Sequence, residues 1–338
     1  MNEHCVVIVG GGISGLSTAF FLSRRAAQEH LSLKITLLEA SDRFGGVLRT
    51  LAYGDLQMEA GADAFYAGSG DTRDLCRELG LQEDVTEVAP CFRRFFGLKD
   101  KKLFPLMASA GSFFEALRFL NDPRLGFFTK CRMLWEPFIP RRKEQGDESL
   151  ASFIRRRLGQ GFYREAVIPL VRGVYMMDPE RVSMETLFLR LQKAERTYGS
   201  LSGYLLKKKN KESPAEFFTL RNGLESLVQA LVRELGVCEL RRSAPVRQCA
   251  YRADWEISME DGTVLHADSL VLAMNACDSS KLLSVGAPGL SRELSTLRYD
   301  SIAAVNLIYK AEDIPSQGLD AGFLVPMDGE RYPFSSLK

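Results

Sequence analysis

Residues 5–15 read Cys-Val-Val-Ile-Val-Gly-Gly-Gly-Ile-Ser-Gly, an apolar strand followed at once by the pattern Gly-x-Gly-x-x-Gly. Residues 16–25 then have the composition of a helix, so the glycines stand in a turn between strand and helix. Gly10 permits the tight turn, Gly12 lets the backbone approach a pyrophosphate, and Gly15 lets the helix pack closely on the strand. Backbone amides at a helix N-terminus bind phosphate. This stretch therefore predicts a dinucleotide-binding α/β fold.

A second strand is predicted at residues 34–38, and it ends at Glu39. A carboxylate at this place in such a fold accepts a hydrogen bond from a ribose 2′-hydroxyl, which a 2′-phosphate would prevent. We therefore expect an adenosine-linked dinucleotide that lacks a 2′-phosphate.

The loop after this strand narrows the choice of cofactor. Residues 39–50 read Glu-Ala-Ser-Asp-Arg-Phe-Gly-Gly-Val-Leu-Arg-Thr. This resembles the Glu-x-x-x-Arg-x-Gly-Gly-x-x-x-Thr signature of FAD-dependent amine-oxidase-type enzymes. Gly45 and Gly46 permit a close approach of backbone to ligand, and Arg43 carries a charge suited to a diphosphate. These residues favour FAD over NAD.

Composition excludes several classes of protein. The chain of 338 residues is 46% hydrophobic and 26% charged, which is typical of a globular protein with two or three domains. Its seven cysteines show no Cys-x-x-Cys spacing, so we expect neither paired disulfides nor a zinc site. The three histidines lack ligand-like spacing, so we expect no metal. Because no signal peptide precedes the first strand and no apolar stretch could span a bilayer, we expect a cytoplasmic protein.

Charge is unevenly distributed along the chain. The net charge is +1, but residues 93–143 contain twelve basic and four acidic side chains, a local net charge of +8. The same window is rich in large aromatic and aliphatic residues. This combination suits an anionic, apolar partner, either a carboxylated substrate or a membrane surface. Amphipathic helices that pack on their own domain would give the same pattern. No nucleic-acid partner is expected, because the fold already binds a dinucleotide.

The remaining pattern indicates a mixed architecture. Residues 93–190 read as mostly helical, with a helix start at residues 147–150. The chain then returns to α/β character, with a helix at 224–235, strands at 245–251, 255–259 and 264–266, a hairpin turn at Asp261-Gly262 and a buried strand at 269–274. The nucleotide-binding domain is thus predicted to be built from separated segments.

Several further stretches make the resemblance more specific. Residues 147–159, 169–175, 182–184 and 195–200, read together, resemble the protoporphyrinogen oxidases, the oxygen-dependent, FAD-containing members of the flavin amine oxidase superfamily. The similarity runs almost from end to end. It implies a Rossmann-like FAD-binding domain made of discontinuous segments, an α+β substrate domain and a mostly helical inserted domain. The implied boundaries are 1–51 and 218–290 for FAD binding, 52–92, 190–217 and 291–338 for substrate binding, and 93–189 for the helical, membrane-associating domain.

The resemblance also implies a reaction. A porphyrinogen would lose six electrons in three two-electron steps of haem biosynthesis. Hydride would pass to FAD, and oxygen would reoxidise the flavin and yield hydrogen peroxide. Because this chemistry belongs mainly to the flavin, no catalytic side chain is identified.

Site residues follow by position. The implied cofactor contacts are Gly10, Gly11, Gly12, Ile13, Ser14, Gly15, Glu39, Ala40, Arg43, Gly45, Gly46 and Val47, with Gly61, Ala62, Asp63 and Ala64 near the flavin and Val246 holding the adenine through its backbone. The implied substrate contacts are Arg94, which would pair with a propionate, together with Gly173 and Tyr175. Arg94 could instead be a surface charge beside Arg93.

Two departures from the family leave alternatives open. Residues 175–179 read Tyr-Met-Met-Asp-Pro where the family has Tyr-Ala-Gly-Asp-Pro, so bulky thioethers stand near the expected substrate cavity. No Gly-rich segment and helix follow Ser301, so the chain is expected to lack the family's C-terminal portion. The alternatives are coproporphyrinogen III oxidation to coproporphyrin III, an amine or carotenoid oxidoreductase, and an FAD-binding protein without turnover. The electron acceptor and a homodimer are also left open.

Overall fold

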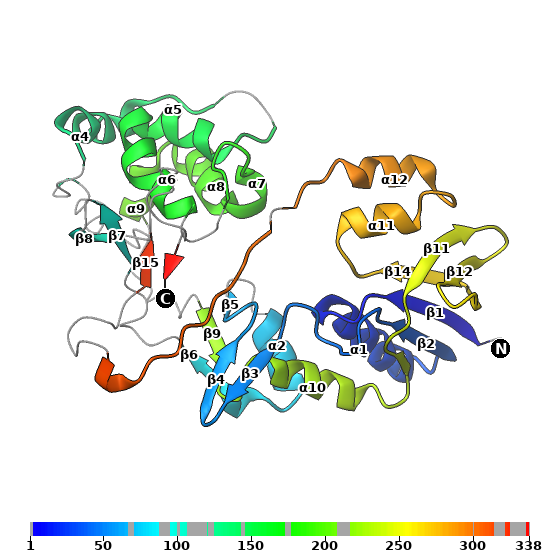
Figure 1. The fold of residues 1–338 in the computed structure, drawn as a ribbon. Helices are drawn as coiled ribbons and strands as arrows, with labels where there is room; N and C mark the ends of the chain where they lie inside the picture. The colour runs from blue at the N-terminus through cyan, green and yellow to red at the C-terminus, as the bar shows by residue number, and fades with distance from the viewer. Residues whose placement is uncertain are drawn as a thin grey trace. The chain divides into compact units, whose positions relative to one another are not determined.

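The computed structural model describes residues 3–66, 71–87, 95–99, 102–106, 120, 125–142, 146–172, 177–207, 217–299, 301–313, 322–324 and 336–337. The chain folds into two compact units (Figure 1). The first comprises Met1–Glu87 and Ala215–Ile308, and the second comprises Val88–Pro214 and Tyr309–Lys338. Both segments predicted for the nucleotide-binding domain fall within the first unit, and the division into three domains stays a prediction.

A parallel sheet forms the centre of the first unit. Its strands are, in spatial order, β10 (Glu239–Arg241), β2 (Leu33–Leu38), β1 (His4–Val9) and β14 (Ser269–Leu272). The last four residues of β1 and of β2 are all buried, as expected for parallel strands covered on both faces. The predicted strands at the start of the chain and at 34–38 are confirmed, and so is the α/β fold class.

Alternate side chains of β1 supply two separate cores, because successive residues of a strand point to opposite faces. Val6 and Ile8 face the helices α1 (Ile13–Gln28) and α10 (Glu225–Glu234). Val7 and Val9 belong to the core on the other face. That core is completed by an antiparallel sheet of β11 (Val246–Tyr251), β12 (Trp255–Met259) and β13 (Val264–Ala267) and by α11 (Ala276–Leu282). The predicted helix at 224–235 and the three predicted strands are confirmed, each within two residues.

Smaller elements surround this sheet. They are the hairpin β3 (Thr50–Tyr53) and β4 (Leu56–Glu59), the sheet of β5 (Phe65–Tyr66), β9 (Phe217–Leu220) and β6 (Val85–Glu87), and the helices α2 (Asp71–Glu78), η1 (Gln82–Asp84) and α12 (Pro288–Ser295). Thr50 joins the hairpin to α10, because its amide donates to Glu225 Oε2 at 3.0 Å and its hydroxyl accepts from the Glu225 amide at 3.1 Å. Thr50, the last residue of the Glu-x-x-x-Arg-x-Gly-Gly-x-x-x-Thr signature, therefore fixes the start of α10.

The second unit is mainly helical. Its helices are α4 (Phe127–Leu134), η4 (Glu136–Phe138), α5 (Leu150–Phe162), a π-helical turn η5 (Tyr163–Val167), α6 (Ile168–Leu170), α7 (Met184–Leu187), α8 (Leu189–Tyr198), α9 (Leu201–Lys207) and η7 (Ala311–Asp313). The predicted helix start at 147–150 is confirmed: the Ser149 side chain accepts the Ser152 amide and caps α5. Phe153 and Met184 lie fully buried in the shared core of these helices. Among the described residues, no helix is long and apolar enough to cross a membrane.

Buried charges connect the helices of this unit. Arg157, fully buried on α5, donates to Glu136 Oε1 from Nε at 2.9 Å and also from Nη2. Glu136 in turn accepts the amides of Leu201 and Ser202, so it caps α9 as well. Arg156 donates to both oxygens of Glu195 on α8. Since a buried charge that loses its partner is strongly destabilising, this network restricts how α5, α8, α9 and η4 pack together.

The second unit also contains strands that the sequence analysis missed. An antiparallel pair, β7 (Phe95–Lys99) and β8 (Lys102–Leu106), is extended by β15 (Gly322–Leu324) and β16 (Ser336–Leu337). Lys99 at the end of β7 pairs with Lys102 at the start of β8. The sequence analysis read residues 93–190 as mostly helical, and the structure differs from that prediction at 95–99 and 102–106, which are strands.

Candidate FAD site

The glycine-rich turn lies between β1 and α1 and requires glycine at two points for steric reasons. Gly10 has φ +110°, and a Cβ there would lie 2.5 Å from the Ala273 carbonyl oxygen. A Cβ at Gly15 would lie only 1.9 Å from the Gly10 carbonyl oxygen. The turn therefore closes tightly on itself and on the segment after β14, as the sequence predicts for a nucleotide-binding loop.

Gly12 differs from its neighbours, because it faces open space. A Cβ at this position would meet no heavy atom within 4 Å, and φ is −73°, which any residue can adopt. Gly12 is also the N-cap of α1, and among the described residues no side chain caps this helix end. The amides of Ile13 and Ser14 lie in the first turn of α1, and backbone amides at a helix N-terminus bind anions. The arrangement fits the pyrophosphate of a dinucleotide.

Glu39 follows β2 and lies directly beside this turn. Its Oε2 accepts the Gly11 amide at 2.6 Å, and its Oε1 accepts the Ser41 amide at 2.8 Å. The Ser41 hydroxyl oxygen also lies 2.7 Å from Oε1. Both carboxylate oxygens are therefore fixed in position, and Oε2, which accepts one hydrogen bond, keeps a lone pair for a further donor such as a ribose hydroxyl. Ala40 is exposed next to Glu39.

Residues 43–47 form a loop that lies against the glycine-rich turn. The Gly45 amide donates to the Gly11 carbonyl at 2.8 Å, and Gly45 pairs with Gly12 as an isolated bridge. Gly45 and Gly46 both have positive φ, at +110° and +57°, so glycine is required at each. Val47 has an exposed side chain, and its carbonyl oxygen would be 2.1 Å from a Cβ at Gly61. The structure thus brings the 61–64 turn, with Ala62, Asp63 and Ala64, beside the loop.

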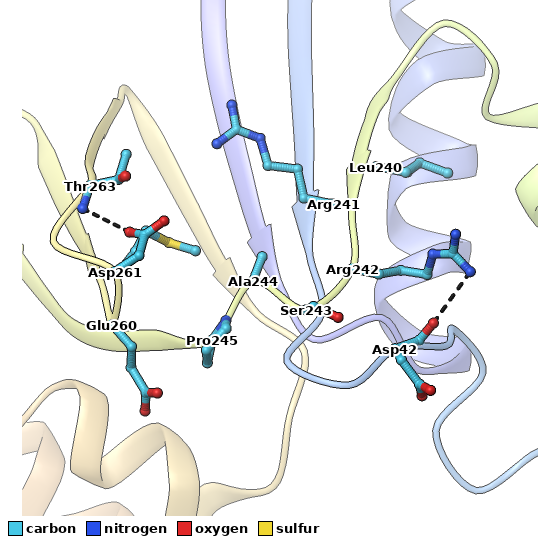
Figure 2. Close-up of a pocket in the computed structure, with 11 residues that line it drawn as sticks. Asp42, Leu240, Arg241, Arg242, Ser243, Ala244, Pro245, Glu260, Asp261 and Thr263 are labelled. Atoms are coloured by element: carbon cyan, nitrogen blue, oxygen red, sulfur yellow. Dashed lines mark hydrogen bonds between the residues drawn. The ribbon is translucent and has the colours of Figure 1, made fainter.

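Val246 reaches the same region from a distant part of the chain. It is the first residue of β11, and the segment before it runs beside the end of β2: the Ala244 amide donates to the Glu39 carbonyl at 2.9 Å. A pocket of about 960 Å³ opens next to this segment (Figure 2). It is lined by Asp42, Leu240, Arg241, Arg242, Ser243, Ala244, Pro245, Met259, Glu260, Asp261 and Thr263. The sequence analysis missed these lining residues, although the pair Arg241-Arg242 at the end of β10 was a signal for them.

The pocket has an acidic and a basic side. Arg242 lies on the same side as Asp42 and donates to its carbonyl oxygen at 3.3 Å, while Glu260 and Asp261 lie opposite (Figure 2). Asp261 accepts the Thr263 amide at 2.8 Å, and this hydrogen bond lowers the pKa of Asp261. Because the lining carries both positive and negative side chains, its charge does not indicate whether a ligand would be an anion or a cation.

The predicted substrate contacts Arg94, Gly173 and Tyr175 lie outside the described residues. Near Gly173 and Tyr175 in the sequence, Tyr163 donates to Glu180 at 2.8 Å, and Arg155 also donates to this carboxylate. Burial, followed by the bond to Glu180, raises the pKa of Tyr163 to about 12. Among the described residues, no group of three or more histidine, cysteine and acidic side chains is placed to hold a metal ion.

Comparison with known proteins agrees with this geometry. Residues 13–338 match the family described as flavin containing amine oxidoreductase. The chain is 33% identical to a protoporphyrinogen oxidase of Bos taurus over 95% of its own length and 70% of that protein. It is 26% identical to a coproporphyrinogen III oxidase of Bacillus subtilis (strain 168), over 96% of this chain and 71% of that protein.

A solved structure has the same fold. A crystal structure of a protein from Exiguobacterium sp. 255-15, provisionally named a protoporphyrinogen oxidase, superposes with a TM-score of 0.79 at 25% identity. The superposition covers 99% of this chain and 72% of that one. The resemblance predicted from the sequence is therefore confirmed, and so is FAD as the cofactor. This chain belongs to the flavin-containing amine oxidoreductase family and is an FAD-dependent oxidoreductase.

Proposed function

We propose that this enzyme oxidises protoporphyrinogen IX to protoporphyrin IX in haem biosynthesis, with oxygen as the electron acceptor. The balanced reaction consumes one porphyrinogen and three molecules of oxygen, and it yields one porphyrin and three molecules of hydrogen peroxide. FAD, when bound, supplies the two-electron chemistry. The observation that carries the proposal is the 33% identity to the Bos taurus protoporphyrinogen oxidase along 95% of this chain.

The first unit is proposed to hold the cofactor. The amides at the start of α1 bind the pyrophosphate, and the fixed carboxylate of Glu39 accepts from the ribose. The 61–64 turn lies toward the flavin, and the backbone of Val246 holds the adenine. What supports this assignment is the open space at Gly12, because every other glycine from residue 10 to residue 15 is packed against protein atoms.

The three predicted substrate contacts belong to the second unit, whereas the substrate-binding domain of 52–92, 190–217 and 291–338 stays a prediction. Arg94 pairs with a propionate of the porphyrinogen, and Gly173 and Tyr175 also contact the substrate. These roles rest on the resemblance to the protoporphyrinogen oxidases. The local net charge of +8 in residues 93–143 supports them, because it attracts a carboxylated substrate.

A second candidate substrate is coproporphyrinogen III, because the chain also resembles the Bacillus subtilis coproporphyrinogen III oxidase. The test is to supply each porphyrinogen separately in air and to follow porphyrin fluorescence together with hydrogen peroxide. Faster turnover of protoporphyrinogen IX, with three peroxides for each porphyrin, supports the proposal. Preference for coproporphyrinogen III replaces it with the second candidate.

A third outcome is a protein that binds FAD without turnover. Anaerobic addition of either porphyrinogen to the FAD-loaded protein distinguishes this case. Bleaching of the flavin absorbance shows electron transfer from substrate. Full flavin absorbance after both additions contradicts the enzyme proposal while leaving the FAD site intact.

We further propose a cytoplasmic enzyme that attaches peripherally to a membrane through α4 and η4. Phe128 is 87% exposed, and Phe127, Trp135 and Phe138 are exposed too. Exposed aromatic rings together with nearby basic residues suit the headgroup region of an anionic bilayer. The pairs Phe127–Phe128 and Trp135–Phe138 have ring centroids 5.9 and 5.2 Å apart, so the rings are grouped in twos.

Sedimentation with vesicles tests the membrane contact. Anionic vesicles should bind the protein, added salt should weaken binding, and Phe128→Glu should abolish it. Val237→Glu is the matched control, because Val237 is 85% exposed but lies in the first unit. Equal binding to neutral and anionic vesicles, or equal loss in the two variants, contradicts the assignment.

The oligomeric state needs its own measurement. Analytical ultracentrifugation without vesicles distinguishes a monomer from a homodimer.

A further inference from the structure

We infer that Arg43 is a positioning residue: it fixes the loop of residues 44–48 against Gly12 and is no ligand of the phosphates. The inference rests on the FAD site proposed above. It concerns the arginine of the Glu-x-x-x-Arg-x-Gly-Gly signature, whose charge by itself would suggest a diphosphate contact.

The guanidinium of Arg43 is surrounded by carbonyl oxygens of its own loop. Nη1 donates to the carbonyls of Phe44 and Leu48, each at 3.1 Å, and Nη2 donates to the carbonyl of Gly46. Three of its five N–H groups are thus engaged by backbone of the loop that follows. A planar fork suits several diverging acceptors, whereas a lysine ammonium is a single point on a flexible stem.

The loop that Arg43 binds forms one wall of the space over Gly12. The Gly45 amide donates to Gly11, and a Cβ at Gly46 would lie 3.3 Å from the Gly12 Cα. A Cβ at Gly45 would lie 3.0 Å from Val228 Cγ2 on α10, so the loop is held from behind as well. A shift of the loop would therefore change the width of the pyrophosphate space.

Arg43 is also connected to the ribose side of the site. The Ser41 amide donates to Glu39 Oε1 at 2.8 Å, and the Ser41 hydroxyl donates to the Arg43 carbonyl oxygen at 2.8 Å. A continuous chain of hydrogen bonds thus runs from Glu39 through Ser41 and Arg43 to the loop and back to Gly11. Through this chain, one side chain positions both ends of the adenosine diphosphate site.

The test compares Arg43→Lys with Arg43→Met, using Arg49→Lys and Arg49→Met as controls at an exposed arginine just after the loop. Hydrogen exchange of the Gly45 and Leu48 amides is measured in FAD-free protein, and FAD affinity is measured at low and high salt. Both Arg43 variants should exchange these amides faster and bind FAD at least about tenfold more weakly, within about threefold of each other. In both Arg43 variants, the salt dependence of FAD affinity should match that of the wild type. The two Arg49 variants should change neither the amide exchange rates nor the FAD affinity.

A direct phosphate contact gives the opposite pattern. Arg43→Lys would then keep most of the affinity, Arg43→Met would lose it together with part of the salt dependence, and amide exchange would stay unchanged. If both Arg43 variants aggregate, amide exchange in the wild type, measured before and after FAD is added, tests the inference instead. Protected Gly45 and Leu48 amides before FAD is added support the inference, and protection that arises only with FAD overturns it. Because the exchange reading uses no substrate, it is independent of the proposed reaction.

Discussion

At the scale of single residues, Gly12 gives the sharpest test of the cofactor site. Added Cβ atoms at Gly12 and at Gly289 meet no heavy atom within 4 Å, and neither residue is in the left-handed region. Valine should therefore be accepted by the protein at both positions. We expect Gly12→Val to fold but to purify without FAD, because the side chain fills the pyrophosphate space, and Gly289→Val to retain FAD. Flavin absorbance per protein is the measurement, and a full complement of FAD in Gly12→Val would show that the site lies elsewhere.

Arg94 allows a second test at this scale, one that the sequence alone motivates. A propionate clamp far from the reacting carbon binds ground state and transition state alike, so its loss raises KM more than it lowers kcat. We expect Arg94→Ala to show this split, and Arg93→Ala, its neighbour in the basic window, to behave as the wild type. Steady-state kinetics with protoporphyrinogen IX supply both constants. Equal effects at the two arginines would indicate diffuse attraction by the basic window instead of a specific pair.

At the scale of elements, the buried ion pairs link the packing of α5 and α8 to pH. Burial alone would raise the pKa of Glu195, but its hydrogen bonds from Arg156 and the charges of Arg156 and Arg157 outweigh burial and lower it. The unfolded chain therefore binds more protons at acidic pH. The stability that Glu195 contributes is complete above its unfolded pKa, about 4.3, and is lost as pH falls through the lower folded value.

This reasoning predicts a difference between two glutamate variants. The melting temperature of the wild type should fall between about pH 5 and pH 3. Glu195→Gln should be less stable at pH 7, because it leaves buried arginines poorly paired, and its melting temperature should depend less steeply on acid. Glu83→Gln, at an exposed position of η1, should follow the wild-type curve. Parallel curves for Glu195→Gln and the wild type would contradict the argument.

A comparison of the elements with the sequence analysis shows what the sequence could predict. The strand at 255–259 and the helix start at 147–150 are confirmed, because local patterns determine them: alternation and turn residues for the strand, and polar residues before an apolar run for the helix. Contacts between distant residues carry no local pattern. The pairing of Arg157 with Glu136 and the bond from Ala244 to Glu39 depend on tertiary packing. The glycine-rich signature was therefore located from the sequence, whereas the pocket beside it was not.

At the scale of the whole molecule, the proposed FAD site is built from two parts of the chain that are distant in sequence. Gly12 and Glu39 come from the first β-α-β segment, and Val246 comes from the returning segment. Two contacts hold these segments together: β10 pairs with β2 in parallel, and α1 and α10 share a core. The site therefore depends on the folding of the whole first unit.

The last prediction concerns apolar residues that the fold leaves uncovered. Residues 301–308, at the end of the first unit, are all exposed, and Ile302, Val305 and Leu307 are among them; Val305 is 76% exposed. Contiguous exposed apolar side chains promote association between molecules. We expect Ile302→Lys together with Val305→Lys to reduce self-association at high protein concentration, measured by light scattering, without lowering the melting temperature, because exposed side chains contribute little to stability. Val285→Lys, at an isolated exposed valine, should leave association unchanged. Unchanged scattering in the double variant would mean that other surfaces drive association.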